Sequence, residues 1–374
     1  MTTPSQLELL APAGGMDALR AALANGADAV YLGLDKFSAR RRAENFTLET
    51  LPEALELTHR CNAKLYVAMN TLLRDGEVDH AANYLEQLCA MGIDAVIVQD
   101  PALAALAADA CSGLALHAST QMTLAEPLAI QTAADQWNLS RVILPRETSL
   151  DDLAAIRKET DIELELFVHG AMCISYSGQC QASRHLGHRS GNRGHCAQPC
   201  RLNWSMECDG APVETEGNHL LSPSDLCLAD RLADMAEAGA NSFKIEGRLK
   251  SPEYVAAVVG VYRTLLDDLL EGNPRAMRRD ESDRLTLAFS RGFSTGYLDG
   301  DRHDELVNPA VAGNLGLPIG EVTRMFGETF FAGLYEGTAE LELGDGVAFG
   351  AFDEDDRRPG GILFGVRRAA QEQI

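Results

Sequence analysis

Short apolar segments alternate along the first 272 residues with longer stretches in which apolar residues recur at helical spacing. Each gap between apolar segments, except the one after the seventh, has the size of a helix and two loops. Strands that alternate with helices pair in parallel through right-handed crossovers. The pattern predicts eight such strands, at residues 7–11, 28–34, 64–70, 94–99, 114–120, 141–146, 162–169 and 241–247.

Eight strand–helix units favour a closed barrel. The phrases NGADAV, MGIDAV and AGANSF each stand between a helix and the next strand, so the same glycine-closed turn recurs as in a repeated β/α unit. Because periodicity alone does not show closure, a doubly wound open sheet is the alternative. We predict an α/β fold with a TIM-like (β/α)8 barrel over residues 1–272, interrupted by a cysteine-rich insertion at 171–224 after the seventh strand.

The remainder of the chain changes character after an amphipathic helix predicted at 252–271. Residues 273–315 are polar and then rich in glycine, which predicts a linker and loop region. From 316 to 374, the segments IGEVTRM, TFFAGLYEG, GDGVAFGAF and GGILFGVRRA alternate with turns. They predict a small C-terminal β-barrel domain, either a structural appendage or an RNA-binding module.

The composition, 46% hydrophobic and 23% charged, is that of an ordinary globular protein. No apolar run has membrane-spanning length, and the first residues lack the features of a signal peptide. We therefore expect a cytoplasmic protein, in which clustered thiols bind metal or do chemistry more often than they form disulfides. The net charge of −23 argues against nonspecific nucleic-acid binding, although a local basic site can still accept an anion.

Residues 166–206 contain no Asp or Glu, in a chain with 55 acidic residues. This segment holds several arginines and histidines and four of the nine cysteines: Cys173, Cys180, Cys196 and Cys200. A local positive field lowers thiol pKa values and favours an anionic ligand set. Only the last two cysteines approach the close pair typical of structural zinc, so a [4Fe–4S] cluster is the favoured interpretation. Zinc and a metal-free site are the alternatives.

The other cysteines, Cys61, Cys89, Cys111, Cys208 and Cys227, stand on predicted helices or at isolated positions. A free cysteine in such a position behaves as a small hydrophobic residue. We expect these five to be buried apolar side chains rather than ligands.

Functional residues of (β/α)8 barrels gather at the carboxyl ends of the strands. We assign proton transfer to His169 and Glu246, and the holding of an anionic substrate to Arg146, Arg193, Arg248 and Lys250. Asn70 and Gln121 are further candidates for substrate binding. The four cysteines directly follow the seventh strand, so we expect them over the mouth of the barrel.

The segments ELFVHGAMC (165–173), YSGQC (176–180), RGHC (193–196) and Cys200-Arg201 resemble the signature of peptidase family U32, the collagenase-like proteins. The resemblance extends to LLAPAGG and NGADAVYLGL near the start, to Arg146-Glu147, and to FKIEGR (243–248) followed by Ser251-Pro252. It covers roughly residues 7 to 325.

The resemblance implies more than the proteolysis for which the family was named. Members similar to this chain are oxygen-independent hydroxylases with a four-cysteine [4Fe–4S] cluster, whose ligands match Cys173, Cys180, Cys196 and Cys200. Some hydroxylate a pyrimidine of transfer or ribosomal RNA, with prephenate as the implied hydroxyl donor. Others hydroxylate ubiquinone precursors, but these space their cysteines differently.

The expected function is therefore iron–sulfur-dependent hydroxylation of an RNA base, with RNA or a small anionic substrate and an electron-transfer protein as candidate partners. Neither a G-x-S-x-G nor an H-E-x-x-H motif is present. A peptidase in which His169 activates Cys173 is an alternative that leaves three cysteines unexplained. Hydroxylation of a small molecule such as a ubiquinone precursor, and a binding role for an inert cluster, are the others.

Overall fold

The computed structural model of the chain describes residues 7–111, 113–300, 306–338, 341–350 and 358–367. Eight parallel strands form a closed barrel, because β11 pairs with β1 on one side and with β7 on the other. The strands are β1 (Glu8–Pro12), β2 (Ala29–Gly33), β3 (Lys64–Met69), β4 (Ala95–Val98), β5 (Ala115–Ala118), β6 (Leu139–Ile143), β7 (Glu163–Ala171) and β11 (Ser242–Ile245). The predicted (β/α)8 barrel is confirmed, and closure excludes the open doubly wound sheet.

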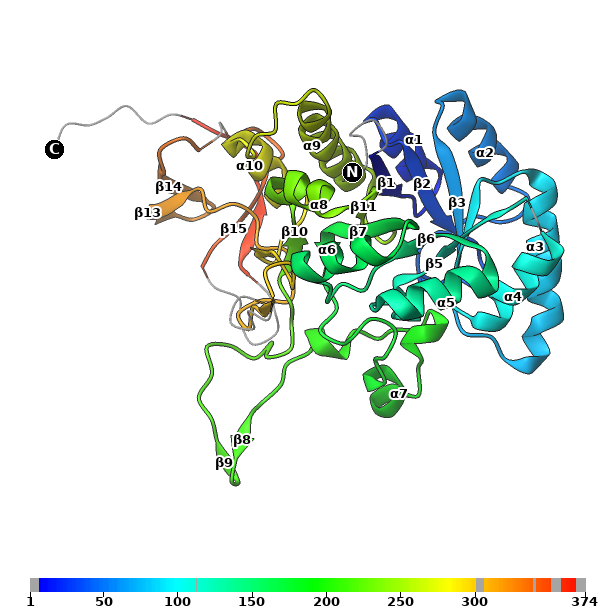
Figure 1. Cartoon of the computed structure of the whole chain (residues 1–374). Helices are drawn as coiled ribbons and strands as arrows, with labels where there is room; N and C mark the ends of the chain where they lie inside the picture. The colour runs from blue at the N-terminus through cyan, green and yellow to red at the C-terminus, as the bar shows by residue number, and fades with distance from the viewer. Residues whose placement is uncertain (1–6, 112, 301–305, 339–340, 351–357, 368–374) are drawn as a thin grey trace.

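Helices follow the strands and surround the barrel (Figure 1). They are α1 (Met16–Ala24), α2 (Leu51–Arg60), α3 (Val78–Met91), α4 (Pro101–Ala110), α5 (Pro127–Trp137), α6 (Leu150–Glu159), α8 (Leu232–Ala238) and α9 (Pro252–Leu270). The sequence marks where α9 begins, since the Ser251 side chain accepts a hydrogen bond from the backbone N–H of Tyr254 and Pro252 occupies the first turn. Among the described residues, no helix combines the length and apolarity needed to cross a bilayer.

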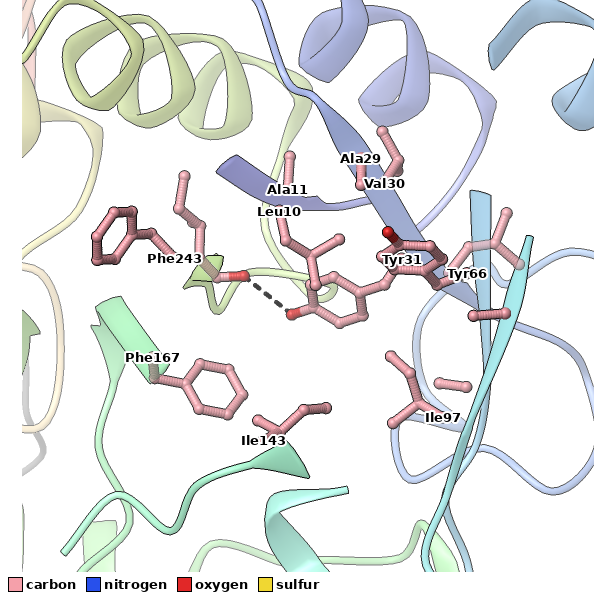
Figure 2. Packing of buried hydrophobic residues seen from close by; sticks show 14 of the residues in the cluster. Leu10, Ala11, Ala29, Val30, Tyr31, Tyr66, Ile97, Ile143, Phe167 and Phe243 are labelled. Atoms are coloured by element: carbon pink, nitrogen blue, oxygen red, sulfur yellow. Dashed lines mark hydrogen bonds between the residues drawn. The ribbon is translucent and has the colours of Figure 1, made fainter. Parts of the chain in front are cut away.

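Side chains fill the barrel interior (Figure 2). Tyr31 of β2 points into it, and its hydroxyl donates a hydrogen bond at 3.0 Å to the carbonyl of Ile245 of β11, the next strand but one (Figure 2). Ile97, Ile143 and Phe167 lie in the same layer and are buried. This layer is the floor on which residues at the carboxyl ends of the strands rest.

A buried ionic network occupies the opposite half of the barrel. Arg141 of β6 contacts Glu8 of β1 and both Glu163 and Glu165 of β7, and Lys244 of β11 donates to Glu165 at 2.8 Å. Buried charges are tolerated when they are paired in this way. A cavity of about 630 Å³ opens beside the network, at the amino ends of the strands. In such barrels that face serves stability rather than catalysis.

The insertion between β7 and β11 contains the short helix α7 (Ala182–Gly187) and a hairpin of β8 (Glu207–Cys208) and β9 (Ala211–Pro212). The hairpin projects away from the barrel (Figure 1). The chain then returns as β10 (Asp225–Cys227), which pairs antiparallel with β7 and parallel with β12 (Phe293–Ser294).

The region 273–315, predicted as a linker and loop, contains β12 and a helix, α10 (Arg279–Ala288), that packs against α9. Its many charged residues suggested a solvated linker, but several are paired. Arg275 contacts Asp268 and Glu281, each at 2.7 Å, and Leu285 is fully buried. Residues 301–305 of this region, like residues 1–6 of the predicted barrel, lie outside the described ranges.

The predicted C-terminal strands are found as β13 (Gly320–Phe326), β14 (Thr329–Leu334), β15 (Gly346–Ala348) and β16 (Gly360–Ile362). In the described part of 316–374 they pair as two separate two-stranded antiparallel sheets, β13 with β14 and β15 with β16. Where a small β-barrel was predicted, the described residues therefore form two small sheets that are not joined to each other. The ends of the last two predicted segments, at 351–352 and 368–369, fall outside the described residues.

Candidate functional site at the barrel mouth

A cavity of about 200 Å³ opens at the carboxyl ends of the strands. Its floor includes Tyr31 and Phe167, and its rim is formed by the loop after β2 and the segment that follows β7. All four clustered cysteines line this cavity: Cys173, Cys180, Cys196 and Cys200. The closed barrel and the insertion thus bring together thiols that are up to 27 positions apart in the sequence.

The four thiols differ in exposure. Cys196 is exposed, whereas the other three are half-buried. Burial and the neighbouring cysteines raise the pKa of Cys200 to about 11, although Arg201 opposes them. The backbone N–H of Gln198 donates to the sulfur of Cys196 at 3.4 Å. Within the described residues, no group of three or more Cys, His, Asp or Glu is arranged closely enough to hold a single metal ion.

The first half of the cysteine segment is fixed to the loops after β5 and β6. The N–H and hydroxyl of Ser177 donate to the two carboxylate oxygens of Glu147 at 2.9 and 3.0 Å, and Thr123 donates to the Ser177 carbonyl at 2.6 Å. Gly178 follows with φ +75°, and a Cβ there would come within 2.1 Å of the Gln121 carbonyl oxygen. This position needs glycine for both its backbone angle and its close approach.

Arg193 fixes the second half of the segment to the loop after β3. Its guanidinium forms an ion pair with Glu77 at 2.7 Å and donates to the carbonyl of Leu72. The backbone N–H of Leu72 in turn donates to the carbonyl of Asn192 at 3.1 Å. Arg193, which was expected to hold substrate, does not line the cavity, because its charge is used in this attachment.

Glu246 lies in the cavity between two arginines. Arg40 is 3.3 Å from one carboxylate oxygen and Arg146 is 3.5 Å from the other. Burial alone would raise the pKa of Glu246, but these arginines, with Arg248 and Lys244, hold it below its usual range. Glu246 is therefore an ionised carboxylate at neutral pH, which can accept a proton but has none to give.

Arg146 and Arg248, both predicted site residues, also line the cavity. Arg146 stacks on the ring of Phe167, with its guanidinium carbon 4.1 Å from the ring centroid. Arg248 donates to the hydroxyl of Ser38 at 2.7 Å, and burial lowers the pKa of Arg248 to about 10. These contacts fix the guanidinium planes, which suits them to recognise a carboxylate or a phosphate.

Asn70 and Gln121 lie side by side at the edge of the cavity. The amide nitrogen of Asn70 donates to the Gln121 side-chain oxygen at 3.0 Å, and the Asn70 oxygen accepts from the backbone N–H of Ala39. The structure thus joins these two predicted residues, which leaves the Gln121 amide N–H groups to face a ligand.

His169 and Lys250 do not line the cavity. His169 is 1% exposed and packs against Tyr262 of α9 and Phe293 of β12, with ring centroids 5.5 Å away in both cases. Burial lowers the pKa of His169 to about 3, so its ring is neutral. Lys250 lies against the ring of Phe289, and burial lowers its pKa to about 7. Proton transfer by His169 and substrate binding by Lys250 were expected at the barrel mouth. Both side chains instead face neighbouring elements outside the cavity.

Sequence reasoning missed the loop after β2. Arg40, Arg41 and Arg42 all line the cavity. The lining holds one carboxylate, Glu246, and five further cationic residues: Arg146, Arg201, Lys244, Arg248 and Arg291. The signal was present as three consecutive arginines close after the second predicted strand. These arginines lie several residues beyond the predicted end of that strand, so strand-end position does not mark them.

The expectation for the five remaining cysteines is partly wrong. Cys111 is buried and Cys89 and Cys227 are half-buried, but Cys61 and Cys208 are exposed. Cys61 directly follows the last turn of α2, and Cys208 stands in the projecting β8–β9 hairpin. Local apolar pattern did not reveal that these positions face solvent.

Fold and cavity together define a (β/α)8-barrel protein whose mouth carries four thiols in cationic surroundings. The model of peptidase family U32 matches residues 14–308, which is most of the chain. The chain belongs to this family.

Several curated proteins are similar over most of this chain. The tRNA hydroxylation protein P1 of Bacillus subtilis is 36% identical over 300 residues, 78% of this chain and 71% of that protein. The 23S rRNA 5-hydroxycytidine C2501 synthase of Escherichia coli is 36% identical over 355 residues, 93% of this chain and 53% of that protein. A collagenase of Porphyromonas gingivalis is 30% identical over 359 residues, which cover 92% of this chain and 86% of that protein. The chain thus spans about half the length of the Escherichia coli synthase.

Proposed function

We propose that this chain hydroxylates a pyrimidine base of transfer or ribosomal RNA. The observation that carries the proposal is the barrel-mouth cavity, which eight cationic residues and one carboxylate line although the chain as a whole has a net charge of −23. Of the eight, Lys244 and Arg291 are paired with carboxylates outside the lining, Glu165 and Asp225, which leaves a clear excess of positive charge. The average field of such a chain repels phosphate, so a local basic site suits it to a polyanion. Relatives named for tRNA and rRNA hydroxylation support the same substrate class.

We propose that Cys173, Cys180, Cys196 and Cys200 hold a [4Fe–4S] cluster. The donor set fits: four thiols line one cavity, and a backbone N–H points at the sulfur of Cys196, as is usual for cluster thiolates. Only Cys196 and Cys200 approach the close pair typical of structural zinc, so the spacing of the cysteines favours such a cluster over one zinc ion. When bound, the cluster would supply redox or Lewis-acid chemistry at the cavity wall.

The proposed reaction exchanges a ring C–H of the base for C–OH. This oxidises the base by two electrons, and a donor that gives up its hydroxyl group and receives hydrogen is reduced by the same two electrons. The exchange therefore balances without dioxygen and without a net supply of electrons. Prephenate, the donor implied by the family resemblance, carries two carboxylates, for which Arg146 and Arg248 offer guanidinium groups inside the cavity.

Glu246 is our candidate for proton transfer. Because its neighbouring arginines keep it ionised, it can accept the proton released at the substrate. The amide N–H groups of Gln121 would hydrogen-bond a polar edge of the base, oriented by Asn70. The alternative peptidase dyad gains no support from the geometry, because Cys173 lines the cavity whereas His169 packs against α9.

Anaerobic purification with iron and sulfide analysis tests the cluster, and nucleoside mass spectrometry of RNA from a deletion strain tests the substrate. We expect the wild-type gene to restore a hydroxylated pyrimidine, and Cys200→Ser to lose both iron and product. Glu246→Gln should retain iron but lose product. Cys61→Ser, at an exposed cysteine outside the cavity, is the matched control and should behave as wild type. If the hydroxylated pyrimidine persists in RNA from the deletion strain, RNA is not the substrate. Metal-independent cleavage of peptides by the purified chain would favour the alternative peptidase function.

A further inference from the structure

We infer that the rim of the cavity binds a single unpaired nucleotide of RNA, with Arg41 and Arg42 on backbone phosphates and Tyr176 stacked on a base. The inference rests on the proposed function and adds to it the conformation of the RNA and the side chains that bind it.

Tyr176 is placed as a stacking platform. It lies between Cys173 and Cys180, lines the cavity, and is 71% exposed. The next residue, Ser177, is held by two hydrogen bonds to Glu147, so the backbone that carries the ring is fixed while the ring itself faces solvent. Proteins that read unpaired RNA stack its bases on aromatic side chains of this kind.

Arg41 and Arg42 supply charge on the same rim. Both are exposed and line the cavity, and in the described part of the chain neither forms an ion pair with a carboxylate. Arg40 differs, because it is half-buried and paired with Glu246. Arg41 also lies 3.1 Å from the ring nitrogen of His195, in the cysteine segment that has no acidic residue. Guanidinium groups without a carboxylate partner, beside an aromatic ring, match the alternating phosphates and bases of a single strand.

The size of the cavity selects the conformation of the RNA. At about 200 Å³ it is smaller than the 300–1,000 Å³ typical of pockets for drug-sized ligands. A cavity of this size favours a single base over a base pair. Enzymes that modify a base inside a structured nucleic acid extract that base from its stack or use an unpaired one. An acidic protein segment would also meet the arginines, but it would make no use of the exposed ring.

Fluorescence anisotropy with a labelled, pyrimidine-rich single-stranded oligoribonucleotide tests the inference on the full chain, purified anaerobically. The logarithm of the binding constant falls linearly with the logarithm of the salt concentration, and for single strands each phosphate contact adds about 0.7 to the steepness of that fall. The double variant Arg41→Gln/Arg42→Gln should therefore make the slope shallower by about 1.4. Tyr176→Ala should weaken binding about tenfold at an unchanged slope, and Tyr176→Phe should restore it. The control is Arg60→Gln, an exposed arginine at the end of α2 that precedes the start of β3. It should bind as wild type.

Three results would overturn the inference: equal affinity for the annealed duplex, binding that the Arg41/Arg42 and Tyr176 variants leave unchanged, or competition by polyglutamate as effective as that by RNA. The last would indicate an acidic protein partner. Binding is measured without turnover, which separates the two proposals. RNA binding that depends on these residues, without hydroxylated product, would support the inference and refute the activity. Full hydroxylation of RNA by the Arg41/Arg42 and Tyr176 variants would support the proposed activity and refute the inference about these residues.

Discussion

Replacing Arg141 by methionine tests whether the barrel interior depends on one buried guanidinium. The Arg141 side chain is 4% exposed and contacts Glu8, Glu163 and Glu165. Methionine fills much of the same space without charge, so the three carboxylates lose their common partner. We expect this variant to be strongly destabilised, because a buried carboxylate without its cation is costly.

The size of the effect follows from what each carboxylate retains. Glu163 is 51% exposed, so water can solvate it, and Glu165 keeps Lys244 at 2.8 Å. Glu8 is 10% exposed and keeps hydrogen bonds from the hydroxyls of Tyr66 at 2.7 Å and Ser242 at 3.1 Å, but its remaining ion pair, with Lys64, is a distant one at 4.0 Å. Essentially one carboxylate is left uncompensated, which places the loss near the lower end of the range for a broken buried pair, about 3 kcal/mol. That is roughly a hundredfold in the folding equilibrium.

The loss should depend on pH. Burial would raise the pKa of Glu8, but Arg141 lowers it below its usual value of 4.5. In the wild type, the ionised Glu8 therefore stabilises the fold above that value, and this contribution disappears as the pH falls through the lower folded-state pKa. Without Arg141, burial raises the pKa of Glu8 instead. The difference between variant and wild type should be largest at neutral pH and shrink in mild acid.

Urea denaturation followed by far-ultraviolet circular dichroism measures both effects. The matched control is Arg20→Met, which removes an ion pair to Asp17 at 3.0 Å whose side chains are 55% and 80% exposed. That variant should lose less than about 1 kcal/mol at either pH. If Arg141→Met unfolds within about 0.5 kcal/mol of wild type at neutral pH, the reasoning about the network is refuted.

Three further changes test other parts of the structure. Gly178→Ala forces a Cβ against the Gln121 carbonyl at a positive φ, so we expect a loss of about 1–3 kcal/mol and faster limited proteolysis of the cysteine segment; unchanged cleavage would argue against this contact. Arg193→Gln removes a partly exposed ion pair with Glu77, so stability should fall by less than about 1 kcal/mol while hydrogen exchange in residues 190–196 rises; equal exchange would contradict the attachment. Lys250→Met removes a lysine whose folded-state pKa is about 7. Above that pH the unfolded chain binds the extra proton, so wild-type stability should rise towards the usual lysine pKa of 10.5, and urea titrations of the variant should lack this rise.

The barrel could be predicted because its signals are local and repeated. Turns such as NGADAV and MGIDAV precede strands in the structure as they do in the prediction, and parallel crossovers leave few arrangements for eight strands. Closure depends on long-range pairing between β1 and β11, which no local pattern contains. Helix α10 was not predicted because the charged residues in it and just before it, such as Glu281 and Arg275, read as solvated when their partners are unknown.

The candidate site was predictable where sequence neighbours stay neighbours in space. Glu246 and Arg248 reach the cavity from the end of β11, as strand-end position indicates. The position of His169 could not be predicted, because a register shift where β7 pairs with β11 accompanies its packing against α9, and this irregularity has no signature in an apolar run. The ion pair of Arg193 could not be predicted for another reason: its partner Glu77 is more than a hundred positions away.

The cysteine segment takes its hydrogen-bond partners from loops after three different strands, through Leu72, Thr123 and Glu147. Its shape is consequently a property of the whole barrel. Grafting residues 171–224 onto an unrelated scaffold would transfer the thiols without the spacing between them. New specificity in this architecture should therefore arise through paired changes, one in the insertion and one in the loop that it rests on.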